Sequence, residues 1–112
     1  MTSPSVLIIS ISALQRLIRE EASYHRELSI QEARVKRLSD EQDRDEYQEW
    51  NLKQERQALE ETRVLLPILK KKIREAMQRL ERHVETVEAR GSTMDELEKA
   101  KEVIQNAKAA LA

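Results

Sequence analysis

The chain of 112 residues contains no cysteine, no phenylalanine, a single glycine and two prolines. Without cysteine it can form no disulfide framework and offers no thiolate for metal binding or catalysis. With one glycine it cannot build the glycine-rich loop that cradles phosphate groups. Glycine and proline also mark turns and strand ends, so their scarcity predicts few loops. These absences argue against nucleotide-binding enzymes, disulfide-stabilised domains and β-sheet proteins.

Groups of catalytic side chains are missing as well. The two histidines, His25 and His83, belong to different predicted helices, and neither completes a Glu-x-x-His metal pair. Neither stands with a nucleophile and an orienting third group. We therefore predict that the protein is not an enzyme and has no cofactor and no metal site. Both histidines fall on predicted interior positions, where we expect partly buried, hydrogen-bonded rings. A metal-binding or pH-sensing role is the alternative.

Neither a strong charge of one sign nor a long hydrophobic run is present. The net charge of −1 argues against a nucleic-acid partner, because nucleic-acid-binding domains carry a clear positive excess. The apolar run at residues 6–9 is too short to span a membrane, and Arg16 and Arg19 follow closely. We interpret it as the start of a core-facing helix rather than a signal or anchor.

What the sequence does have is a heptad pattern. Charged residues make up 37% of the chain, as is typical of long helices packed by heptads. From residue 52 to 87 every seventh position is a branched aliphatic: Leu52, Leu59, Leu66, Ile73, Leu80 and Val87. Pro67 interrupts this stripe, and an interior proline kinks or breaks a helix at a cost of about 3 kcal/mol. The pattern predicts a helix over about 47–89.

Two further helices flank this one. The first covers about 6–42, with Ser3 or Ser5 as cap and Pro4 in the first turn. Its predicted interior stripe is Leu7, Ile11, Leu14, Ile18, Glu21, His25, Leu28, Glu32 and Val35. The third covers about 94–111, with interior positions Leu97, Ala100, Ile104, Ala107 and Leu111.

Two turns separate the predicted helices. We place the first near residues 43–46, in the acidic stretch 40–46. The second is residues 90–93, where Gly91 suits a left-handed helix end and Thr93 with Glu96 forms a capping box. Because short connections make consecutive helices antiparallel, we predict one all-α domain over 1–112. It is an elongated up-down-up three-helix bundle, spectrin- or coiled-coil-like, with a proline-interrupted second helix and a shorter third.

Three features leave alternatives open. The polar interior positions are Glu21, His25, Glu32, Glu55 and Thr62, and they form either a hydrated layer that fixes register or a place where the helices diverge toward a partner. Residues 40–61 carry nine acids and three bases, whereas residues 63–82 carry seven bases and two acids. That change of sign gives either a solvated face or a steering field for a charged protein. Tyr47 and Trp50 either cover one end of the bundle or form an exposed binding hot spot.

Several spaced residues resemble a known family. The first helix contains residues 16–20 as Arg-Leu-Ile-Arg-Glu, then Tyr24 with Glu27, then Gln31-Glu32. The second contains Lys53-Gln54, Leu59 and Leu65-Leu66-Pro67. This spacing resembles that of the tubulin-binding cofactor A family, also called tubulin-specific chaperone A. One departure is Leu52, where the family pattern has a second lysine. The resemblance covers about 14–74, and the third helix is similar only in type.

The resemblance implies a function. Members of the family are three-helix bundles without enzymatic activity. They bind a quasi-native β-tubulin intermediate released by the cytosolic chaperonin and pass it to later tubulin-folding cofactors for αβ-heterodimer assembly. We therefore expect a cytoplasmic, cytoskeleton-associated protein that is a monomer or weak homodimer. As β-tubulin-binding residues around the proline we predict Tyr24, Glu27, Gln31, Lys53, Gln54, Arg56, Arg63, Lys70 and Arg74.

Two rival interpretations follow from the residues alone. A generic coiled-coil scaffold or assembly subunit would be a constitutive oligomer held together by its interior stripes. A lipid-sensing bundle at a membrane surface would need a long basic amphipathic face free of acids, and the sequence has none.

Overall fold

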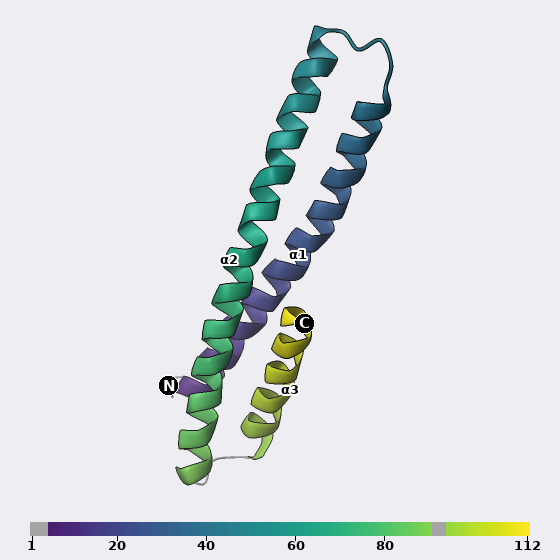
Figure 1. Cartoon of the computed structure of the whole chain (residues 1–112). Helices are drawn as coiled ribbons and strands as arrows, with labels where there is room; N and C mark the ends of the chain where they lie inside the picture. Colours follow the sequence, from purple (N-terminus) through teal and green to yellow (C-terminus); the bar gives the residue numbers. More distant parts are fainter. Residues whose placement is uncertain (1–4, 91–93) are drawn as a thin grey trace. The chain divides into compact units, whose positions relative to one another are not determined.

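The computed structural model describes residues 5–90 and 94–112. These residues form three α-helices and no strand: α1 (Val6–Asp40), α2 (Glu46–Arg90) and α3 (Met94–Leu111) (Figure 1). The predicted all-α fold of three helices is confirmed, and each helix begins and ends within two residues of its predicted bounds. Within the described residues, we find no helix with the length and apolar character needed to cross a bilayer.

The helices form two compact units. The hairpin unit is residues 22–68, and the described residues of the three-helix unit are 5–21, 69–90 and 94–112. The helices α1 and α2 are each divided between the two units, so that each contributes one segment to the hairpin unit and another to the three-helix unit. Helix α3 belongs wholly to the three-helix unit. Within the three-helix unit, α2 runs antiparallel to α1 and α3 runs antiparallel to α2 (Figure 1).

The three-helix unit has a continuous apolar core. Its buried members come from all three helices: Leu7, Ile11, Leu14, Ile73, Ala76, Leu80, Val84, Ala100, Val103, Ile104 and Ala107. Their spacing of three and four residues places them on one face of each helix. On α3 the alternation of alanine with larger aliphatic residues lets that helix approach both neighbours closely. Burying each large aliphatic side chain contributes about 1.5–3 kcal/mol relative to its exposure.

The hairpin unit buries fewer aliphatic side chains than the three-helix unit. Its buried aliphatic residues are Leu38, Leu52, Leu59 and Leu66. Gln31 and Thr62 are buried beside them, at 7% and 6% exposure. The Thr62 hydroxyl donates to the carbonyl of Ala58 at 3.2 Å, whereas the Gln31 side-chain oxygen accepts no hydrogen bond from the described residues. Since burial of aliphatic side chains is the main stabilising contribution, this core, with four of them, is the less stabilising of the two.

Pro67 does not break α2. The helix continues through it from Glu46 to Arg90, and Pro67 itself is exposed. Its ring removes the N–H that would bond to the carbonyl of Arg63. Because Pro67 is on the solvent side of the helix, water can reach that carbonyl.

The helix ends are closed by side chains. The Ile8 amide donates to the Ser5 hydroxyl at 3.1 Å, so Ser5 is the cap of α1. At the start of α2 the Gln48 amide donates to Asp45 Oδ1 and the Asp45 amide donates to Gln48 Oε1, both at 2.8 Å. This is a reciprocal capping box, which we had not predicted here. The predicted turn residues Gly91 and Thr93 lie outside the described residues, so the box predicted for Thr93 and Glu96 stays a prediction.

Candidate functional site

Most of the predicted binding residues are accessible to a partner. In the hairpin unit the exposed ones are Tyr24, Glu27, Lys53, Gln54, Arg56 and Arg63. In the three-helix unit Arg74 is exposed and Lys70 is half-buried. In both units these side chains project from helices rather than from loops, so the backbone beneath them is regular.

Gln31 is the exception, because we had predicted it to lie on the outer face and it is buried. The interior stripe of α1 in the hairpin unit runs through Gln31 and Leu38, whereas we had predicted His25 and Glu32 as interior residues and both are exposed. A heptad stripe advances by alternating steps of three and four residues, and Leu28 and Val35, seven residues apart, fit either order of the two steps. Gln31 is therefore a packing residue.

Polar contacts join α1 to α2 within the hairpin unit. Arg34 Nη1 lies 3.3 Å and 3.4 Å from the two carboxylate oxygens of Glu55, whose side chain is only 20% exposed. Arg56 Nη2 donates to the Ser39 hydroxyl at 3.2 Å, and Arg63 Nη2 lies 3.9 Å from Glu32 Oε1. The pair at Glu55 supports the interpretation of the polar interior positions as a layer that fixes register. Arg56 and Arg63 thus each contact a residue of α1, in addition to any contact that they make with a binding partner.

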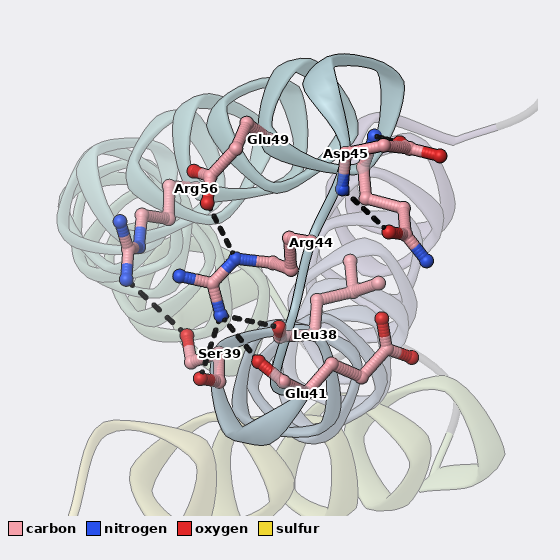
Figure 2. Close-up of polar contacts among 8 residues, drawn as sticks. Leu38, Ser39, Glu41, Arg44, Asp45, Glu49 and Arg56 are labelled. Atoms are coloured by element: carbon pink, nitrogen blue, oxygen red, sulfur yellow. Dashed lines mark hydrogen bonds and ion pairs between the residues drawn. The ribbon is translucent and has the colours of Figure 1, made fainter.

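The turn between α1 and α2 is organised by Arg44 (Figure 2). Its Nη1 donates to the carbonyls of Leu38, Ser39 and Glu41 at 3.3, 3.0 and 2.8 Å. Its Nε donates to Glu49 Oε1 at 2.7 Å. The guanidinium therefore satisfies carbonyls at the end of α1 that have no helical donor. We had counted Arg44 among the three bases of residues 40–61 and had predicted no contact between it and the carbonyls at the end of α1. The sequence signal that could have revealed this role is a single arginine placed shortly after the end of a predicted helix.

Tyr47 and Trp50 are both exposed, at 70% and 56%. Their rings are stacked, with centroids 6.1 Å apart and planes at 27°. An open cavity of about 430 Å³ adjoins Trp50 and is lined by Glu49, Trp50, Leu52, Lys53 and Arg56. Exposure of this kind fits the binding hot spot and contradicts the interpretation that the two rings pack over one end of the bundle.

His83 has a structural contact in the three-helix unit. It is half-buried, and its Nδ1 lies 2.6 Å from the Ser10 hydroxyl, which joins α2 to α1. A partly buried, hydrogen-bonded ring is what we predicted for this residue. Across the described ranges 5–90 and 94–112, no three His, Cys, Asp or Glu side chains are grouped as metal ligands.

A groove with charged rims lies in the three-helix unit. A cavity of about 430 Å³ between α1 and α2 is lined by Ala13, Arg16, Leu17, Glu20, Lys72, Glu75, Ala76 and Arg79. Its floor is apolar and its rims carry three bases and two acids. Mixed charges of this kind are typical of a surface that faces water, so the groove gives no sign of a specific ligand.

Comparison with known proteins decides the family. The family model of tubulin binding cofactor A matches residues 2–104. The chain belongs to the tubulin binding cofactor A family. Tubulin-specific chaperone A of Saccharomyces cerevisiae is 38% identical over 93 residues, which cover 83% of this chain and 85% of that protein. The family is one of tubulin-binding chaperone cofactors and not of enzymes.

Solved structures of the family share the fold. RBL2P, a beta-tubulin binding post-chaperonin cofactor, has a TM-score of 0.81 and 36% identity over 96% of this chain and 98% of its own. Tubulin folding cofactor A from Arabidopsis thaliana has a TM-score of 0.78 and 26% identity over 92% of each chain. Tubulin-binding cofactor A from Leishmania major, at 22% identity and a TM-score of 0.79 over 95% of this chain and 94% of its own, shows the same fold.

Proposed function

We propose that this chain is a tubulin-folding chaperone that binds and holds a quasi-native β-tubulin intermediate released by the cytosolic chaperonin. It passes that intermediate to later tubulin-folding cofactors for αβ-heterodimer assembly, and it acts in the cytoplasm in association with the cytoskeleton. The observation that carries the proposal is the 36% identity to RBL2P, a beta-tubulin binding cofactor, over nearly the whole of both chains. The identity to the yeast chaperone supports it.

A chaperone of this kind acts by mass action. Binding the intermediate lowers its free energy by an amount set by the dissociation constant and the concentration of chaperone. Neither nucleotide nor metal enters that step, so an exposed helical surface suffices. We expect the protein to hold its client as a monomer or weak homodimer.

The proposed contact residues are the accessible ones of the predicted set. In the hairpin unit they are Tyr24, Glu27, Lys53, Gln54, Arg56 and Arg63, and in the three-helix unit they are Lys70 and Arg74. Lys53 and Gln54 are the strongest candidates, because both are exposed and neither is required by packing.

The test is a triple variant, Lys53→Ala, Gln54→Ala and Arg63→Ala. We expect it to recover at least tenfold less β-tubulin than the wild type when the immobilised chain captures tubulin and the α and β subunits are resolved. The far-UV circular dichroism should be unchanged, since all three side chains are exposed. A matched control replaces Arg82, Gln105 and Lys108, which are also exposed, and should recover β-tubulin normally.

Either of two results would count against the proposal. Equal recovery by the triple variant and the control would exclude this surface. Failure of the wild type to recover β-tubulin, together with self-association in light scattering, would favour a coiled-coil scaffold instead.

A further inference from the structure

A second heptad stripe runs along α2 in the hairpin unit, roughly opposite the buried stripe that faces α1. Its positions are separated by alternating steps of three and four residues, and every one of them is exposed. We call it the outer stripe, and its members are Tyr47, Trp50, Gln54, Gln57, Glu61, Val64 and Ile68.

The composition of the outer stripe is not that of a solvated face. Only Glu61 is charged, in a chain whose residues are 37% charged. One end carries the stacked Tyr47–Trp50 pair, and the other carries Val64 and Ile68 at 57% and 48% exposure. A helix face that meets only water normally carries charged and polar residues. Exposed apolar side chains gathered along one line mark an interaction surface.

The spacing indicates what shape of partner fits. Alternating steps of three and four residues are those by which one α-helix packs side chains between those of another. From residue 47 to 68 the stripe extends for about 32 Å at ~1.5 Å per residue. A partner helix of about six turns would contact it over its full length.

The charges along one edge of the outer stripe indicate which charges a partner helix would carry. Glu46, Lys53 and Glu60 line one edge, seven residues apart, so the signs alternate along it. Lys53 takes part in none of the ion pairs found among the described residues, and Glu60 has only a 3.8 Å contact with Arg63. A matching helix would present an uncharged stripe with apolar side chains at both ends. It would carry an acid opposite Lys53 and a base opposite Glu60.

We propose that the outer stripe is the docking surface for one amphipathic helix of the β-tubulin client. This inference rests on the proposed function and assigns it a face of the molecule. Gln54 belongs to the stripe and Lys53 to its edge, so two residues of the family pattern coincide with a surface selected independently by exposure and spacing. The aromatic and aliphatic ends anchor the client helix, and the amides of Gln54 and Gln57 hydrogen-bond at its middle.

The test introduces charge into the outer stripe. In the double variant Val64→Glu and Ile68→Glu both side chains are exposed, so the fold should tolerate the change, and circular dichroism checks this. We expect its dissociation constant for purified β-tubulin to rise at least tenfold. The matched control is Gln78→Glu, an exposed position of α2 in the three-helix unit, which should bind within twofold of the wild type.

A spectroscopic measurement checks the contact directly. Trp50 is the only tryptophan, so incorporation of 5-fluorotryptophan gives a single fluorine resonance from the outer stripe. That resonance should shift or broaden when β-tubulin is added to the wild type.

Each other outcome overturns the inference in a recognisable way. If the wild type binds β-tubulin and the double variant binds equally well, the client docks elsewhere and only the docking surface is wrong. If the wild type does not bind β-tubulin, the proposed function fails and the inference fails with it. If sedimentation shows a wild-type dimer that the double variant abolishes, the occupant is a second copy of this chain.

Discussion

Two adjacent residues close both helices at the first turn. Arg44 satisfies two carbonyls in the last turn of α1 and that of Glu41 just beyond it, and Asp45 exchanges two hydrogen bonds with Gln48 at the start of α2. Asp43, between them and α1, has a φ of 59°, in the left-handed region that aspartate tolerates better than most residues. The turn therefore needs no glycine, because polar side chains satisfy the backbone groups that a reversal leaves open.

The capping box is testable by substitution. We expect Asp45→Ala to lower the free energy of unfolding by about 1 kcal/mol, because two amides at the start of α2 lose their partners. Gln48→Ala should cost less, and the double variant should cost less than the sum, since the two side chains act reciprocally. Urea unfolding followed by circular dichroism measures all three. Gln42→Ala, at an exposed turn position, should change stability little. A strictly additive double variant would contradict reciprocity.

Prediction at the residue scale succeeded where side chains are aliphatic and failed where they are polar. Leu52, Ile73 and Leu80 are buried, and their branched side chains repeat every seven residues. Gln31 was misplaced because a polar stripe does not distinguish a step of three from a step of four. Arg44 was missed for another reason: its contacts depend on the path of the turn, and no periodic pattern reports that path.

At the scale of the element, α2 is a continuous helix that contains a proline. Bounds were predictable because composition changes sharply at the turns, and Pro67 was visible as an interruption. The heptad stripe predicted one helix across Pro67, and the structure adds the packing that keeps it continuous, since Leu66 and Leu69 are buried on either side of Pro67. Packing of such side chains outweighs a local cost of about 3 kcal/mol.

Replacing the proline should strengthen the helix. We expect Pro67→Ala to raise the free energy of unfolding by up to about 3 kcal/mol, because alanine restores the N–H that bonds to the carbonyl of Arg63. The midpoint temperature of thermal unfolding and the helical ellipticity should both increase. Gln57→Ala, an exposed substitution in the same helix, removes no such defect and should shift stability by less than about 0.5 kcal/mol. An unchanged or lower stability for Pro67→Ala would show that the ring makes a native contact worth the lost hydrogen bond.

At the scale of the whole molecule, the two units differ in whether their residues are continuous in the sequence. The hairpin unit is one uninterrupted segment, residues 22–68, closed by a turn of five residues. The three-helix unit joins residues that precede that segment to residues that follow it. The heptads predicted three helices but not this division, because a periodic pattern reports which side of a helix is buried and not how contacts are grouped.

This division implies an order of folding. Bringing α1 against the second half of α2 closes a loop of 47 residues if the hairpin unit is still unfolded, and loop closure costs more entropy as the loop lengthens. A hairpin formed first removes most of that loop, and contacts local in sequence form fastest. In stopped-flow experiments Asp45→Ala should therefore mainly slow refolding, with a φ-value near 1, whereas Val103→Ala in the three-helix core should mainly speed unfolding. The reverse pattern would place the nucleus in the three-helix core. The reciprocal hydrogen bonds of Asp45 and Gln48 then determine when the chain folds as well as where α2 begins.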